Sequence, residues 1–169
     1  MPMNFVDFFI KICYKAAQRG EYTMIKATDV ANYFLSLVDP DDDDCISNLK
    51  LQKLCYYAQG FHLAIYGKRL FDEDLQAWQH GPVVPSLYRK YKEAGKSCLM
   101  PDANFDFKTL PEEVRELLNE VYQNYGQFSA WRLRDMTHQE SPWQTSYNKT
   151  TDDVISDKKL IEFFKTRLA

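Results

Sequence analysis

Residues 50–85 read KLQKLCYYAQGFHLAIYGKRLFDEDLQAWQHGPVVP, and the organisation of the rest of the chain follows from this segment. Its first half predicts a deeply buried helix, because apolar side chains recur at intervals of three and four residues. They are Leu54, Tyr57, Ala58, Phe61 and Ile65. Ser47 is expected to cap this helix and Gly67 to end it. Gly60 inside the helix costs about 1 kcal/mol relative to alanine, so we expect another stretch of backbone to pass close to it.

The second half of the segment predicts a short extended piece that turns sharply at residues 78–82, Trp-Gln-His-Gly-Pro, into a new helix. His80 in this turn has two interpretations. Its ring holds the turn by hydrogen bonding to the backbone, or it makes a recognition contact at a rigid corner. A similar corner at His138 ends in Trp143, which we expect to anchor it to the core. If the two corners meet, their rings form one binding surface.

Helical patterns also occupy most of the remaining chain. Further helices are predicted at about 28–38, 83–94, 109–125, 129–136 and 156–168, with an irregular loop at 137–143. The expected caps are Thr28 or Asp29, Thr109, Ser129 and Ser156. We therefore predict a mostly α fold, a compact single-domain helical bundle of five to seven helices with at most a short β-hairpin. Residues 1–23 are predicted to form an N-terminal amphipathic extension, and residues 24–169 the domain itself.

The composition limits the classes of protein to consider. The chain has 169 residues, 45% of them hydrophobic, which suffices for one domain with a substantial core. Its net charge of −3 argues against a protein that coats nucleic acid. No apolar run reaches the roughly 20 residues that span a bilayer, so no membrane association is predicted. The four cysteines form no CxxC pair, and we predict a reducing, cytoplasmic location in which Cys55 is a small buried apolar residue.

Neither a catalytic site nor a metal site is predicted. The aspartates of residues 39–44 lack the glycine and the terminal glutamate of a calcium loop, so a solvated acidic loop is expected. Cys55, His80 and Asp74 can be imagined as a catalytic set, but a cysteine in the middle of a helix lacks the exposed, electropositive setting of a reactive thiolate. We predict no enzymatic activity and no cofactor.

The most basic segment is residues 86–96, which carries four cations and one acid. A solvated helix face is one interpretation, and a contact surface for an acidic partner is the other. A third interpretation, a nucleic-acid-binding regulator that uses this helix, predicts an affinity that falls steeply with salt.

Residues 50–88, followed by Tyr125-Gly126, Leu133, Thr137-His138 and Ser141-Pro142-Trp143, resemble the Panacea domain. This domain is also called the SocA-like antitoxin domain, and its members are often labelled phage-associated GepA-like proteins. The resemblance covers about residues 24–143. The family-pattern positions in this chain are Trp78, His80, Gly81, Pro82, Thr137, His138, Pro142 and Trp143.

The resemblance implies a compact helical antitoxin domain of a prokaryotic or phage toxin–antitoxin system, which binds and blocks a cognate toxin protein encoded nearby. One type of member acts instead as a proteolytic adaptor that delivers its toxin to an ATP-dependent protease. Neither role is catalysis by the domain. On this basis we predict direct binding of a toxin, and nucleic acid is an unlikely partner. The family-pattern positions either contact the toxin or hold the fold. Further interface candidates on the basic helix are Tyr88, Arg89, Tyr91 and Lys92.

Overall fold

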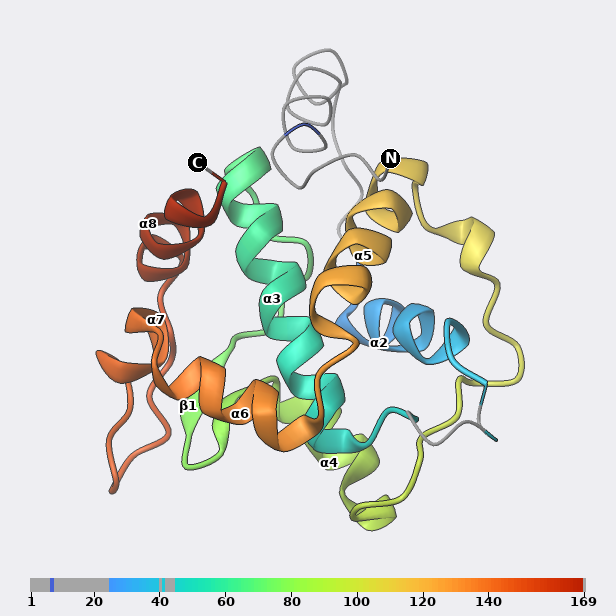
Figure 1. Cartoon of the computed structure of the whole chain (residues 1–169), viewed down its shortest axis with the longest axis horizontal. Coiled ribbons are helices and arrows are strands. Elements are labelled where there is room, and N and C mark those ends of the chain that lie inside the picture. Colours follow the sequence, from blue (N-terminus) through green and yellow to red (C-terminus); the bar gives the residue numbers. More distant parts are fainter. Residues whose placement is uncertain (1–6, 8–24, 40, 42–44, 169) are drawn as a thin grey trace.

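The computed structural model describes residues 7, 25–39, 41 and 45–168 (Figure 1). In this part of the chain there are seven α-helices, two short 3-10 helices and one two-stranded antiparallel hairpin. In chain order they are α2 (Ala27–Ser36), α3 (Asn48–Tyr66), β1 (Gln76–Trp78), β2 (Gly81–Val83), α4 (Pro85–Tyr91), η1 (Lys92–Ala94), η2 (Phe107–Thr109), α5 (Glu112–Tyr125), α6 (Ala130–His138), α7 (Ser141–Gln144) and α8 (Asp157–Arg167). The predicted mostly α, single-domain bundle with a short hairpin is confirmed.

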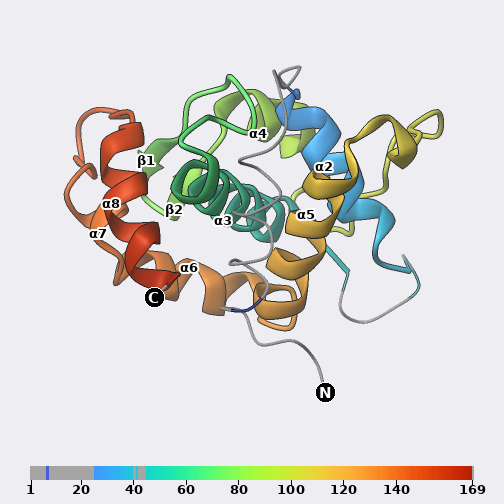
Figure 2. The ribbon, with the colours of Figure 1, turned by 90° about the horizontal axis from the view of Figure 1, so that it is seen from above.

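Helix α3 runs through the centre of the molecule, and the other elements surround it. Figure 2 shows α3 almost end-on, with α8, α6, α5, α2, α4 and the hairpin arranged about it. Every residue from 50 to 63 is buried, so α3 has no solvent-facing side over this length. Aromatic and aliphatic side chains supply much of this buried circumference. The other buried positions are polar and include Gln52, Lys53 and Gln59.

The central glycine of α3 makes room for an aromatic ring. A Cβ atom added to Gly60 would overlap the ring of Phe164 in α8. That ring lies edge-on to Phe61 at a centroid distance of 4.8 Å and to Tyr56 at 5.4 Å. The close approach predicted at Gly60 therefore exists, but the prediction that backbone makes it is wrong, because the neighbour is a side chain of α8.

Four predicted helix signals are confirmed. Ser47 accepts a hydrogen bond from the backbone N–H of Lys50 at 3.4 Å, and Gly67 ends α3 in the left-handed conformation with φ 66°. Ser129 and Ser156 cap α6 and α8 in the same way as Ser47 caps α3. These signals are local, since each needs only the residues of one helical turn.

Other predicted boundaries are wrong. Helix α2 begins one turn earlier than Thr28 or Asp29 implies, with Lys26 as its N-cap. Thr109 lies in the 3-10 turn η2, and Pro111 takes the N-cap position of α5. The basic helix changes to 3-10 geometry at Lys92. Residues 141–144, predicted to be an irregular loop, form the single turn α7 with proline in its first turn.

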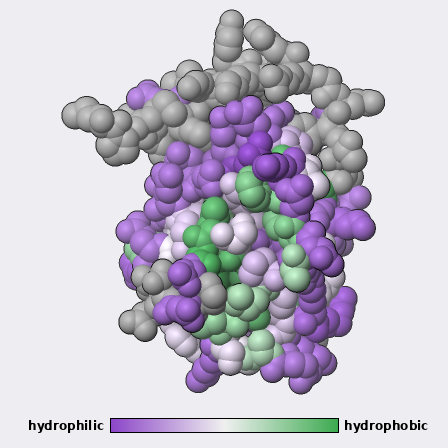
Figure 3. All heavy atoms as spheres, turned by 90° about the vertical axis from the view of Figure 1, so that its right-hand side faces the viewer, coloured by the Kyte–Doolittle hydropathy of each residue, from purple (hydrophilic) through white to green (hydrophobic). Residues whose placement is uncertain are grey.

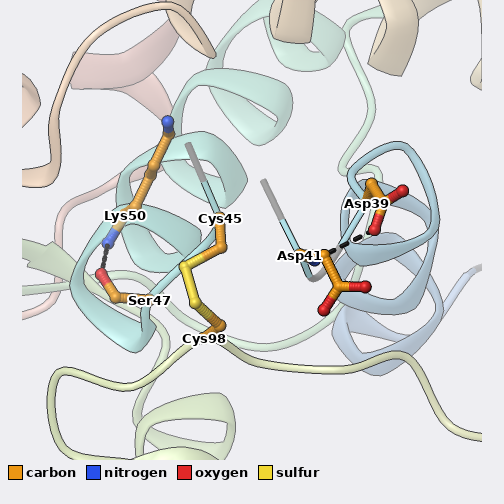
Figure 4. Close-up of a disulfide and its surroundings, with 6 residues drawn as sticks. All are labelled: Asp39, Asp41, Cys45, Ser47, Lys50 and Cys98. Carbon is orange, nitrogen blue, oxygen red and sulfur yellow. Dashed lines mark hydrogen bonds between the residues drawn. A yellow bond between two sulfur atoms is a disulfide. The ribbon is translucent and has the colours of Figure 1, made fainter. Parts of the chain in front are cut away.

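A disulfide joins the segment before α3 to the segment after η1 (Figure 4). It connects Cys45 and Cys98, with a Cα–Cα distance of 5.4 Å, and the N–H of Leu99 donates to the carbonyl oxygen of Ile46 at 2.9 Å beside it. No spacing motif predicts this pair, and a disulfide departs from the reducing setting expected for the four cysteines. Cys55 is unpaired and buried, as expected of a small apolar residue.

The predicted N-terminal extension falls almost wholly outside the described residues, so the division at residues 23 and 24 stays a prediction. None of the helices in the described segments combines the length and the apolar character that crossing a membrane requires.

Candidate partner-binding site

The two corners that carry the family-pattern residues lie against each other. The indole Nε1 of Trp143 donates a hydrogen bond to the backbone oxygen of Trp78 at 2.8 Å. The ring of His138 stacks on that of Trp143 with a centroid distance of 3.7 Å. Trp143 is buried, as predicted, and it fixes the hairpin to the α6–α7 corner. We call the assembled set the motif corner: Trp78, His80, Gly81, Pro82, Thr137, His138, Pro142 and Trp143.

Glycine is required at the bend of the hairpin. Gly81 has a φ of 98°, and a Cβ there would lie 2.7 Å from both the Cε atom of Lys53 and the Oγ1 atom of Thr137. The ammonium group of Lys53 donates to the carbonyl oxygen of Pro82 at 2.9 Å. The hairpin bend is therefore pressed between α3 and α6, and Gly81 permits both the backbone conformation and the contact.

The motif corner covers a buried lysine that sequence patterns did not single out. Lys53 is fully buried in α3, and burial, followed by the charge of Arg134, lowers the pKa of its ammonium group to about 7. A buried lysine is expensive unless its donors are satisfied, and the carbonyl of Pro82 satisfies one of them. In the sequence Lys53 looks like an ordinary surface lysine, and its burial is evident only from the structure.

A buried carboxyl group lies between α6 and α7, at the N-cap position of α7. Glu140 accepts hydrogen bonds from the hydroxyls of Tyr56 and Tyr57, both at 2.8 Å. Burial raises the pKa of Glu140 to about 7. Within the described part of the chain neither Glu140 nor Lys53 forms a salt bridge. Hydrogen bonds, rather than an ion pair, thus satisfy these two buried groups.

The exposed edge of the motif corner is aromatic and basic. Trp131 at the start of α6 is 54% exposed, and the ring of His80 lies edge-on to it at 5.7 Å. The guanidinium carbon of Arg134 lies 5.9 Å from the centre of the same indole. We call these three residues the Trp131 anchor. In the sequence, Trp131 is one of the apolar residues of the helix predicted at 129–136, and nothing there separates it from the core positions. The buried positions of α6, Leu133 and Thr137, show that it lies off the core-facing side.

The candidates on α4 separate into exposed and buried side chains. Tyr88 is 38% exposed and contacts Trp78 edge-on at 5.0 Å, which joins the exposed side of α4 to the hairpin. Arg89 on α4 and Lys92, the first residue of η1, are exposed. Tyr91 is buried, at 9% exposure, and belongs to the core. Tyr91 is therefore not available as an exposed anchor, because its side chain is part of the hydrophobic core.

The residues of the imagined catalytic set lie apart in the structure. Cys55 is enclosed in α3, and burial raises the pKa of its thiol well above the ordinary value. Asp74 pairs with Arg69 at 3.0 Å, and His80 faces Trp131. Over residues 25–39, 41 and 45–168, no cluster of three histidine, cysteine or acidic side chains is arranged to hold a metal ion.

The chain is a small, mostly α domain in which helices surround one buried helix, α3. Its motif corner fixes the hairpin to α6 and α7. The family model described as "Antitoxin SocA-like, Panacea domain" matches residues 51–144, the region from α3 to α7. The chain belongs to this family, as its sequence motifs predict.

One relative is the protein named Antitoxin SocA from Caulobacter vibrioides (strain NA1000 / CB15N). It is 30% identical over 155 residues, which cover 79% of this chain and 82% of that protein. No solved structure matches the fold.

Proposed function

We propose that this protein is an antitoxin that neutralises a partner toxin by binding it directly. Membership of the SocA-like antitoxin family carries the proposal, since a relative named Antitoxin SocA aligns with most of both chains. Direct binding, rather than catalysis, is supported by the buried state of Cys55 and by the dispersal of the imagined catalytic residues. We further propose the cytoplasm as the place where the two proteins meet, a reducing compartment in which Cys45 and Cys98 would stand as free thiols.

The motif corner contains both buried and exposed residues, and we assign these two groups different roles. Gly81, Thr137 and Trp143 are buried and tie the hairpin to α3 and α6, so they are proposed to hold the binding surface in place. His80 is exposed at the bend of the hairpin and is proposed to touch the toxin. Residues that fix a surface in advance reduce the entropy lost on binding.

The exposed side of α4 extends this surface. Tyr88 adjoins the hairpin through Trp78, and Arg89 and Lys92 stand beside it on solvent-facing positions. A stable interface buries about 800 Å² on each partner, which the hairpin, α4 and α6 together provide more readily than any one of them alone. Tyrosine and arginine are the residue types that most often anchor such interfaces.

The nucleic-acid alternative has less support from the geometry of the basic helix. Lys90 pairs with Asp102 at 2.8 Å, and Lys92 lies 3.8 Å from Glu93, so acids partly neutralise the segment.

Delivery of the toxin to an ATP-dependent protease is a further mode of action that direct binding permits. It requires a second contact, with the protease, in addition to the toxin interface.

Co-expression with the product of the adjacent gene tests the proposal. Growth inhibited by that product alone and restored by this protein, together with a co-purified complex, is the expected result. Arg89→Glu should weaken the complex, whereas Lys165→Glu, at an exposed position on α8, serves as the matched control. An adjacent product that is toxic but neither bound nor neutralised would contradict the proposal. Toxin levels that fall only when an ATP-dependent protease is present would indicate the adaptor mode.

A further inference from the structure

An exposed tryptophan on α6 has no role in the core of the domain. Trp131 is 54% exposed, whereas Leu133 and Thr137, two and six residues later, are completely buried. The helix is therefore attached to the domain through other residues. Tryptophan is the side chain most enriched among residues that dominate binding energy, because its large apolar surface is costly to leave in water.

The cation beside this tryptophan has unused hydrogen-bonding capacity. Arg134 lies 5.9 Å from the Trp131 ring centre and bonds its sequence neighbour Asp135 at 2.7 Å through one terminal nitrogen. Its Nε atom is buried and has no hydrogen-bond partner among the described residues. The Nε2 atom of His138 is in the same situation. These two buried atoms are closed to a partner, but the Arg134 side chain as a whole is 29% exposed, so the terminal nitrogens of its guanidinium can donate to an incoming carboxylate.

The surface under the Trp131 anchor is rigid. The hydroxyl of Thr137 donates to the carbonyl oxygen of Arg134 at 2.8 Å and packs against Gly81. The Lys53–Pro82 and Trp143–Trp78 hydrogen bonds fix the hairpin that carries His80. The three side chains of the anchor are therefore presented by two elements that are fixed to each other.

The charge of the anchor is opposite to that of the whole chain. Arg132 and Arg134 lie in the first half of α6 beside one acid, Asp135, while the chain carries a net charge of −3. A local basic surface attracts an acidic partner at short range. A long polyanion such as nucleic acid needs an extended run of cations, whereas this cluster holds two arginines, so the charge favours a short acidic protein segment.

We propose that Trp131, Arg134 and His80 receive an acidic segment of the toxin, with Trp131 covering its apolar side chains and Arg134 pairing with a carboxylate. This assignment rests on the proposed antitoxin function and adds to it the site of contact and the chemistry of the partner. It also identifies α6, rather than α4, as the element that contributes most to affinity.

The test measures the affinity of the full chain for the toxin identified by co-expression. Trp131→Ala is expected to weaken binding about 30-fold or more, and Arg134→Glu about as much, in line with residues that dominate an interface. Arg134→Lys keeps the charge but loses the fork, so it should give a smaller loss. On binding, the fluorescence of the wild-type protein should shift to the blue, and this shift should be absent in Trp131→Phe. Circular dichroism and thermal melting of each variant establish that the fold is retained.

A second exposed surface provides the matched control. Figure 3 shows the side of the molecule that carries the segment from η1 to α5, where apolar side chains gather within a polar surround. Phe107 on this segment is 44% exposed, and Lys108 follows it. The double variant Phe107→Ala/Lys108→Glu removes an aromatic ring and reverses a cation, as the anchor variants do, and is expected to change the affinity less than 3-fold.

Three outcomes overturn the proposal and differ from one another. If the wild-type complex forms and the anchor variants bind as tightly as the wild type, the anchor assignment fails while the antitoxin function stands. If no complex forms, the proposed function fails and the anchor with it. If a single-stranded oligonucleotide binds with a steep salt dependence and Trp131→Ala abolishes that binding, the partner is nucleic acid. Conversely, recovery of Arg134→Glu binding by a carboxylate-to-lysine change in the toxin would establish the charge pairing directly.

Discussion

The buried carboxyl of Glu140 should make the stability of the domain depend on pH. Its pKa is about 7 in the folded protein and 4.5 in the unfolded chain, a difference that corresponds to about 3 kcal/mol. A folded-state pKa that is raised means that the folded protein binds the proton more tightly. The stabilisation is therefore complete below pH 4.5 and is lost as the pH rises through 7.

The variant Glu140→Gln isolates this contribution, because the amide resembles the protonated acid and does not titrate. We expect the free energy of unfolding of the wild type, minus that of the variant, to fall by about 3 kcal/mol between pH 4 and pH 8. Loss of one tyrosine hydrogen bond adds a constant offset that does not depend on pH. Lys53 contributes in the opposite sense, since its lowered pKa adds stability only as the pH rises from about 7 toward 10.5, and it is present in both proteins.

Urea unfolding followed by tryptophan fluorescence at half-unit pH intervals measures the difference. Glu162→Gln, at an exposed position of α8, is the matched control and should give curves parallel to the wild type. A difference between the wild type and Glu140→Gln that stays constant within about 0.5 kcal/mol across this range would refute the reasoning. It would mean that the carboxyl is as well solvated, or as well paired, in the folded state as in the unfolded chain.

Three further changes test other parts of the structure. Reduction of the Cys45–Cys98 disulfide, or Cys98→Ser, should lower the free energy of unfolding by about 4 kcal/mol, the loop-closure entropy for a crosslink that spans 53 residues. Equal urea midpoints with and without dithiothreitol would contradict this. Gly60→Ala forces a methyl group into a ring of α8 and should cost about 3 kcal/mol, seen as a lower melting temperature. Gly81→Ala should destabilise more than Gly67→Ala, because both have positive φ but only Gly81 has neighbours within 3 Å. Similar melting temperatures for these two variants would argue against the packing of the hairpin bend.

The parts of the fold that the sequence predicts are those encoded within one helical turn. Ser47 and Gly67 mark the ends of α3 through contacts with residues three or four positions away, and the heptad-like recurrence of apolar residues between them identifies the buried helix. The start of α5 is less certain from sequence, because Thr109 and Pro111 both fit a helix start and only packing selects one. Propensity alone does not make that choice.

The site depends on contacts between segments that are far apart in the chain. For this reason the buried carboxyl, the exposed tryptophan and the disulfide could not be predicted from local patterns. The partners of Glu140 are Tyr56 and Tyr57, more than 80 residues earlier, and adjacent tyrosines in an apolar helix look like packing residues. Trp131 fits an apolar helical position equally well whether it faces the core or the solvent. The disulfide was missed for a similar reason, since its two cysteines lie in connecting segments without any spacing motif.

The position of Phe164 has a consequence for the protein as it is being made. The aromatic centre of α3 is complete only when this ring fills the space over Gly60, and α8 leaves the ribosome after every other helix described above. Until then, Tyr56 and Phe61 lack one of their neighbours and the nascent chain presents an incomplete core. The domain should therefore acquire its native form late, after translation has passed α8. A ribosome that stalls upstream of α8 would leave a product open to degradation and unable to bind a partner through the finished surface.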